Sequence, residues 1–317
     1  MLNLKIFNWI QVSVFLWVMF KIILSVESII GSFGNGFIAL VNCMDWVKRR
    51  KISSVDQILT ALALSRIGVL WSVLTSLFVP SFYPGFSMTT KMIRMINITW
   101  TVTNHFNLWL STNLSIFYFL KIANFSNSIF LYLKWRVKKV VFVILLMSLI
   151  LLLLNIVLIN IPNDVWLGGN ESNMSYSSSS RKFAQFSRLL SFTNCMFTSI
   201  PFAVSLLAFL LLIISLWKHL KRMQHNARGS RDASTSAHVK ALQIGITFLV
   251  LYAIFFLSLV IQASGSEFQG RKPVILFCQA VGIVFPSGHS LVLISGNGKL
   301  RRASLSVLWW LRGRSKC

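Results

Sequence analysis

Charged side chains are scarce in this sequence, and acidic ones are scarcer still. Only 12% of the 317 residues are charged and just seven are Asp or Glu, whereas 55% are hydrophobic. A water-soluble domain has no place for so much apolar surface. The shortage of carboxylates also argues against a transporter, which typically carries several intramembrane acids. Glu27 alone falls well inside an apolar segment. We therefore expect an all-α membrane protein.

Cysteine is also rare, which bears on covalent cross-links. Three of the four cysteines fall in or at the ends of apolar segments and the fourth is the last residue: Cys43, Cys195, Cys278 and Cys317. No two of them share the predicted outer loops, so we expect no disulfide. We interpret Cys317 as a free thiol, with palmitoylation beside the basic tail as the alternative.

Groups that bind metals or catalyse reactions are not gathered anywhere along the chain. His219, His225 and His238 share one segment, but they lack metal-ligand spacing and no Cys or carboxylate joins them. No convergent nucleophile and base is evident. We expect no metal, no cofactor and no enzymatic activity.

What the sequence does contain is long apolar runs. A helix crosses the bilayer with about 20 mostly apolar residues, and seven such stretches occur, at roughly residues 22–43, 57–79, 95–119, 140–161, 189–217, 241–262 and 274–296. The first is preceded by further apolar residues without a signal-peptide cleavage pattern. We interpret these as an extension of an uncleaved first span, and Met1 and Met19 both stay open as the initiator.

The basic residues alternate between the segments that join these spans. Residues 44–56, 120–139, 218–240 and 297–317 hold 4, 5, 6 and 6 Lys or Arg, whereas residues 1–21, 80–94, 162–188 and 263–273 hold 2, 2, 3 and 2. Such asymmetry is the positive-inside pattern. It predicts a seven-transmembrane helix bundle in the plasma membrane, with the N-terminus outside and the C-terminus as a basic cytoplasmic tail. The net charge of +24 is therefore assigned to topology and to attraction for membrane lipid, not to nucleic acid.

Two glycosylation motifs agree with this orientation. They begin at Asn170 and Asn173, and both fall in the segment 162–188, which we expect to be an extracellular loop.

One permanent cation lies inside a span. Arg66 is about nine residues, or roughly 13 Å, into the second span, where insertion of a charge costs about 2.5–3.5 kcal/mol. It must therefore face the bundle interior. Counting depth along the neighbouring spans places Asn35 and Ser290 at the same level. We predict that Arg66 hydrogen-bonds Asn35 and a seventh-span acceptor, either Ser290 or a carbonyl freed by Pro286. The alternative is an isolated buried arginine retained for insertion.

Four sequence blocks carry a resemblance to a known family: LALSR at 62–66, FYFLKIANFSN at 117–127, LWKH at 216–219 and PSGHSLVLI at 286–294. In this order and spacing they resemble the type 2, or bitter, taste receptors, which are seven-span G-protein-coupled receptors. Asp-Arg-Tyr after the third span and Asn-Pro-x-x-Tyr in the seventh are lacking, as in that family. A vomeronasal-type chemoreceptor or a small-solute transporter remains the alternative function.

Candidate ligand-binding residues come from periodicity in the outer halves of the spans. Trp100 and Asn104 are one helical turn apart and share a face, so an indole and an amide would meet a small molecule together. Further candidates at similar depth are Phe197, Tyr252, Phe255, Leu259 and Gln279. The resemblance implies agonist contacts for all of these except Phe197 and Tyr252. Interhelical packing is the alternative role for each aromatic residue.

The inner ends of the spans carry the candidate G-protein surface. It comprises Lys121, Asn124, Phe125, Lys218 and His219, together with the run KWRVKK at 134–139. The resemblance implies bitter small molecules as agonists and a gustducin-type heterotrimeric G protein as partner.

Overall fold

The described part of the chain is a succession of helices. The computed structural model describes residues 2–49, 52–82, 90–123, 125–167, 176–226, 233–264 and 272–314. Within these residues the helices are α1 (Leu2–Arg49), α2 (Ser54–Phe82), α3 (Thr90–Ile122), α4 (Ser128–Trp135), α5 (Val137–Leu167), α6 (Tyr176–Asn226), α7 (Ala233–Ser264), α8 (Lys272–Gly296) and α9 (Gly298–Arg314).

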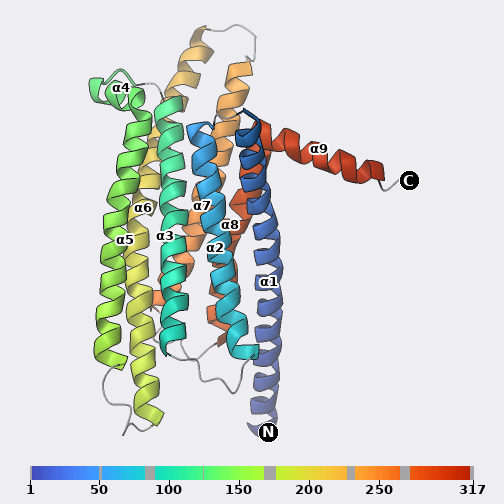
Figure 1. Cartoon of the computed structure of the whole chain (residues 1–317), viewed down its shortest axis with the longest axis vertical. Helices are drawn as coiled ribbons and strands as arrows, with labels where there is room; N and C mark the ends of the chain where they lie inside the picture. Colours follow the sequence, from blue (N-terminus) through green and yellow to red (C-terminus); the bar gives the residue numbers. More distant parts are fainter. Residues whose placement is uncertain are drawn as a thin grey trace.

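Seven of these helices run side by side as a bundle, and each contains one of the seven predicted spans (Figure 1). The two others, α4 and α9, lie at the same end of the bundle (Figure 1). Following the orientation predicted from charge, we call this end the inner end and the opposite one, where α1 begins, the outer end.

The third span departs from the simple hydropathy rule. Among the described residues, six helices are long and apolar enough to cross a membrane, and α3 is not one of them. Nevertheless α3 has 33 residues, about 50 Å at 1.5 Å per residue, which exceeds the hydrocarbon thickness of about 30 Å.

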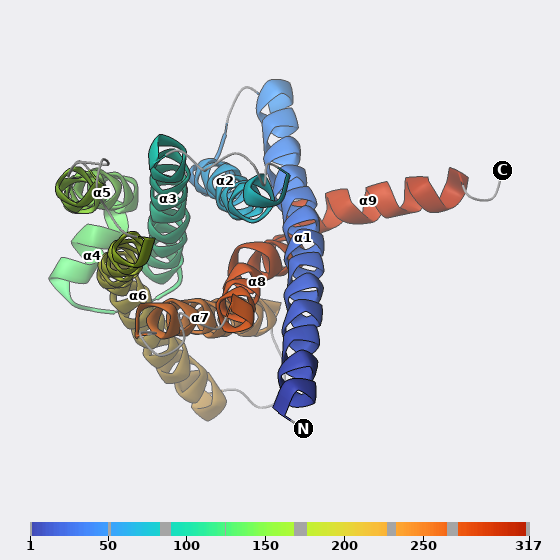
Figure 2. The ribbon, with the colours of Figure 1, turned by 90° about the horizontal axis from the view of Figure 1, so that it is seen from below.

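The position of α3 explains its polarity. It packs against α2, α5 and α6 (Figure 2), so little of its surface is left for lipid. Many of its buried residues are polar: Thr101, Asn104, His105, Asn107, Ser111, Thr112, Asn113 and Ser115. A helix enclosed by other helices does not need an apolar surface all round, because its polar groups can hydrogen-bond to neighbouring helices. Thr112, for example, bonds with Ser205 of α6. The low hydropathy of α3 therefore reflects enclosure by protein.

Some helices are longer than the spans predicted from the sequence. Residues 162–167 belong to α5 and residues 176–188 to α6, so much of the segment that we assigned to an extracellular loop is helical. Likewise most of the basic tail forms α9. The apolar pattern marks where a helix enters lipid, but a helix does not have to end at the bilayer surface. Asn170 and Asn173 lie outside the described residues, so their glycosylation stays a prediction.

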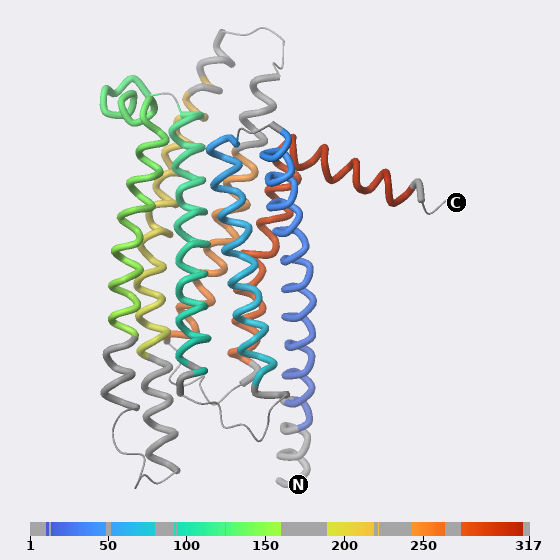
Figure 3. Tube along the Cα trace, in the orientation of Figure 1, coloured from blue at the N-terminus to red at the C-terminus, as the bar shows by residue number. Residues whose placement is uncertain are grey.

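The tube in Figure 3 follows α1 along the edge of the bundle, with α2 and α8 beside it. Cys43, Cys195 and Cys278 are free thiols, whereas Cys317 lies beyond the described part of the chain.

Candidate functional site

Two cavities lie between the helices of the bundle, one above the other along its axis. The outer cavity has a volume of about 240 Å³ and is bordered by α2, α3, α6, α7 and α8. The inner cavity has a volume of about 250 Å³ and is bordered by the same five helices nearer their inner ends. Both are therefore enclosed by residues far apart in the sequence.

The outer cavity contains four of the seven residues predicted to bind ligand: Trp100, Phe255, Leu259 and Gln279. It also has polar side chains that the sequence reasoning missed: Ser72, Ser76, Asn97, Ser191, Asn194, Ser258 and Gln262. Asn97 lies three residues before Trp100, so the helical spacing that selected Trp100 would also have found it. The resulting lining is apolar and aromatic, with amides and hydroxyls at several points.

Asn104 and Phe197 do not line this cavity. They border a much smaller space of about 10 Å³ between α3, α5 and α6, about the volume that holds a single water molecule. Asn104 is 4% exposed there, close to the equally buried Asn155 of α5. Asn194 borders both spaces. Trp100 and Asn104 are one turn apart on α3, yet Trp100 lines the outer cavity and Asn104 lines the small space beside α5 and α6.

Tyr252, the remaining predicted ligand residue, lines none of these cavities. It is 0% exposed and stacks on Phe285 of α8 with ring centroids 5.1 Å apart. Phe285 is also 0% exposed and stacks on His289 one turn further in. Together with Arg66, whose guanidinium lies 5.6 Å from the Phe285 ring centroid, these side chains separate the two cavities. We call Arg66, Tyr252, Phe285 and His289 the partition.

Arg66 is fully buried and connects three helices of the bundle. Its Nε donates to Asn107 Oδ1 on α3 at 3.1 Å, and its Nη2 donates to Ser111 Oγ on α3 at 3.4 Å. Nη2 also meets Nδ1 of His289 on α8. Since Arg66 itself is on α2, one guanidinium joins α2, α3 and α8. Its charge is thus shielded from lipid by neutral hydrogen-bond acceptors.

Arg66 lies inside the bundle and meets an acceptor on the seventh span, as predicted, but that acceptor is His289. The partners named from the sequence, Asn35 and Ser290, were wrong. Asn35 donates to the carbonyl oxygens of Gly31 at 2.8 Å and Pro286 at 3.1 Å. The hydroxyl of Ser290 donates to Ser287 O within its own helix and faces Gly34 of α1.

The error has a geometric cause. Ser290 follows His289 directly, and successive side chains on a helix are about 100° apart, so only His289 points from α8 toward α2 and α3. The prediction compared only the depths of residues in the first and seventh spans, and it left out α3, which supplies Asn107 and Ser111.

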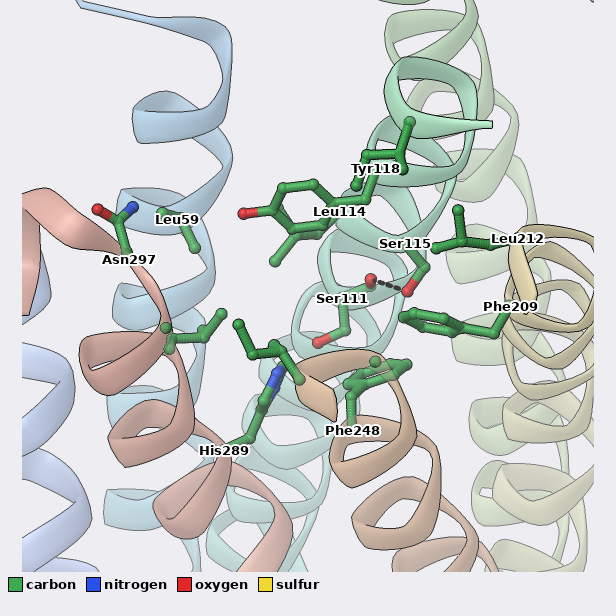
Figure 4. A pocket seen from close by; sticks show the side chains of 15 residues that line it. Leu59, Ser111, Leu114, Ser115, Tyr118, Phe209, Leu212, Phe248, His289 and Asn297 are labelled. Atoms are coloured by element: carbon green, nitrogen blue, oxygen red, sulfur yellow. Dashed lines mark hydrogen bonds between the residues drawn. The ribbon is translucent and has the colours of Figure 1, made fainter. Parts of the chain in front are cut away.

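The inner cavity begins on the other side of the partition. Figure 4 shows the side chains of Tyr118, Phe248 and His289 turned toward it from α3, α7 and α8. Ser111, an acceptor for Arg66, is part of the same lining. His289 of the partition thus lines the inner cavity, and Phe285 of the partition packs on Phe255, which lines the outer cavity.

The predicted G-protein residues lie at the inner end. Lys121 lies in the last turn of α3 and is exposed, and Lys218 is exposed on α6. Phe125 instead packs inward against Phe119 and Phe130, with ring centroids 6.3 and 5.2 Å away. It therefore contacts both α3 and α4. The side chain of His219 and the whole of Asn124 lie outside the described part of the structure.

Comparison with known proteins identifies the family. The chain matches the family described as "Taste receptor protein (TAS2R)" over residues 12–312. It is 59% identical to taste receptor type 2 member 140 of Rattus norvegicus over 92% of this chain and 93% of that one. It is 57% identical to taste receptor type 2 member 14 of Macaca mulatta, covering 94% and 93% of the two chains. With the human member 14 the identity is 56% over 92% of each chain. This protein therefore belongs to the type 2 taste receptors, the seven-helix bitter taste receptors that act through G proteins and are not enzymes.

Proposed function

We propose that this receptor detects bitter small molecules in its outer cavity and activates a gustducin-type G protein at its inner end. The observation that carries the proposal is the lining of the outer cavity, where the indole of Trp100 and the amides of Asn97 and Gln279 face one space. A concave, mostly apolar site with a few converging polar groups is the usual form of a small-molecule pocket.

The lining also indicates which chemistry binds. An indole offers a flat surface for stacking, and amides and hydroxyls donate or accept hydrogen bonds at its edges. Among the described residues of the outer cavity, none carries a formal charge. We expect agonists of modest size that combine an apolar ring system with neutral hydrogen-bonding groups.

A chain of aromatic contacts leads from this cavity to the inner one. Phe255 borders the outer cavity and packs on Phe285 with centroids 5.6 Å apart. Phe285 stacks on His289, which borders the inner cavity. An agonist that moves Phe255 therefore disturbs the packing of α7 against α8 below it. An agonist shifts the receptor toward the active conformation only if it binds that conformation more tightly.

A matched pair of tryptophans tests the ligand site. Trp71 on α2 is 57% exposed on the side of the bundle that faces away from the cavities, whereas Trp100 lines the outer cavity. Trp100→Ala should raise the agonist concentration for half-maximal calcium release by tenfold or more, since a buried aromatic anchor contributes about 2 kcal/mol or more to binding. Trp71→Ala should leave it unchanged, with surface expression measured for both.

The proposal fails if Trp100→Ala, at wild-type surface expression, responds like the wild-type protein to every active compound. G-protein coupling is tested separately in cells that lack the endogenous gustducin-type α subunit. Calcium release should appear when that subunit is supplied and be absent without it. Solute uptake that does not depend on the subunit would support the transporter alternative instead.

A further inference from the structure

The small space between α3, α5 and α6 is lined by polar side chains that are almost fully buried. Six of its lining residues are polar and at most 7% exposed: Thr101, Asn104, His105, Asn155, Asn194 and Thr198. In the described part of the chain, four of their atoms are buried without a hydrogen-bond partner: Thr101 Oγ1, Asn104 Oδ1, His105 Nε2 and Asn155 Oδ1. Leaving buried polar atoms unpaired is costly, and folded proteins pair nearly all of them with protein or with ordered water.

The chemistry of these atoms indicates what binds between them. The amide oxygens of Asn104 on α3 and Asn155 on α5 are acceptors only, so they do not hydrogen-bond each other. Both are satisfied by one neutral group that donates two hydrogens. A water molecule is such a group, and its own oxygen still accepts a hydrogen bond from a hydroxyl such as that of Thr101.

Pro201, inside α6, adds a backbone acceptor at the same place. Proline has no N–H, so the carbonyl of Phe197, four residues earlier in the helix, loses its usual donor. Phe197 and Pro201 both line the small space. The nearby hydroxyl of Thr112 on α3 is engaged by Pro201 O and Ser205 Oγ. In membrane helices, ordered water is one of the groups that satisfy a carbonyl freed by proline.

The size and charge of the space restrict its ligand further. Its volume of about 10 Å³ is about the least that holds one water molecule, and it is too small for an organic compound. None of the described residues in its lining has a carboxylate. A metal ion buried there would lack the opposite charge that buried ions require, so a neutral ligand is favoured.

We propose that this space is a binding site for one ordered water molecule, held by the oxygens of Asn104 and Asn155 beside the carbonyl freed by Pro201. The water joins α3, α5 and α6 through hydrogen bonds that these helices do not make directly. The site is distinct from the outer cavity, although Asn194 lines both. It does not depend on which compound the outer cavity binds.

Radiolytic footprinting of the full-length receptor in nanodiscs tests this proposal. X-rays convert water into hydroxyl radicals, which react where they form, so a buried ring beside a bound water is oxidised although bulk solvent does not reach it. Trp109 lines the space and is 7% exposed, and mass spectrometry should detect its oxidation. Tyr252, which is 0% exposed and belongs to the partition, should stay unmodified in the same sample.

Two variants of α5 separate the water site from general loosening of the helix. Asn155→Leu replaces the amide with an apolar side chain and should abolish the oxidation of Trp109, because apolar spaces stay dry. Ser148→Ala removes a hydroxyl that donates to Leu145 O within α5 and should leave the oxidation unchanged. If Asn155→Leu does not fold, Thr101→Val, which keeps the shape of the side chain, should lower the oxidation instead.

Three results would overturn the proposal. The first is a wild-type receptor in which Trp109 stays unmodified. The second is oxidation of Trp109 that is the same in wild type and Asn155→Leu, or that is abolished equally by Asn155→Leu and Ser148→Ala. The third is a melting temperature that rises with sodium at constant ionic strength in the wild type but not in Asn155→Leu, which would assign the space to a cation.

Discussion

Replacing Arg66 with lysine keeps the positive charge in the partition but removes the planar guanidinium that hydrogen-bonds in several directions. The guanidinium of Arg66 makes hydrogen bonds through Nε and Nη2 to three side chains on two neighbouring helices. A lysine ammonium is a single point on a flexible stem and cannot reach all three acceptors at once. At least two of the three interactions should therefore be lost.

The size of the effect follows from the measured free energies of hydrogen bonds between membrane helices. These average about 0.6 kcal/mol and reach about 1.7 kcal/mol, so two lost bonds correspond to about 1–3 kcal/mol. Arg66→Lys should thus unfold at a temperature several degrees lower. A convenient assay is the reaction of a thiol-specific dye with Cys278, which is only 4% exposed in the folded protein and becomes accessible on unfolding.

A double-mutant cycle with Asn107→Leu tests whether the interaction itself is responsible. The bond from Arg66 to Asn107 exists only when both residues are present, so the two changes together should destabilise the protein less than the sum of each alone. Our account of the partition is wrong if Arg66→Lys melts like the wild-type protein, or if the two changes are additive.

Further predictions concern helix packing and the first turn of α9. Gly68→Ala should destabilise the fold by about 1–3 kcal/mol, because the added methyl would lie 2.6 Å from Thr103 on α3, whereas Gly36→Ala, with open space at that position, should be neutral or slightly stabilising in the same melting assay. Lys299, near the start of α9, forms ion pairs with Asp45 at 2.9 Å and Asp56 at 3.3 Å. Lys299→Met should speed hydrogen exchange of the backbone amides at the start of α9. It should change the melting temperature little, since partly exposed ion pairs contribute about 0–1 kcal/mol each. Lys299→Arg, which retains the charge, should restore slow exchange, and equally fast exchange in both variants would show that the ion pairs do not fix the helix.

The seven spans and the burial of Arg66 could be predicted from the sequence because each follows from local rules. An apolar run of sufficient length has to enter the bilayer, and a charge at that depth has to face protein. The third span shows the limit of the first rule. Its buried polar residues, such as Asn107 and Ser111, lower its hydropathy because the helix is enclosed, and enclosure depends on the arrangement of all the other helices.

The site residues were harder to predict for the same reason. Depth can be counted along one helix, but the direction of a side chain depends on how that helix is rotated against its neighbours. His289 and Ser290 lie at nearly the same depth, yet only His289 meets Arg66. In the same way Trp100 and Asn104 share a helical face but open onto different spaces. The rotation of a helix about its own axis could have been inferred only by knowing which of its residues contact a neighbouring helix.

The chemistry of the partition suits a protein that changes between two conformations. A buried cation with a single fixed partner would oppose any movement of α8 against α3, since losing that partner would leave the charge unsatisfied. Arg66 instead has five donor hydrogens, and in the described part of the chain its Nη1 has no hydrogen-bond partner. Its acceptors are neutral and come from two helices. When α8 shifts, the guanidinium is able to exchange one acceptor for another while its charge stays solvated by protein. The same group is therefore able to bridge α2, α3 and α8 in more than one arrangement, which a receptor with two conformations of similar free energy requires.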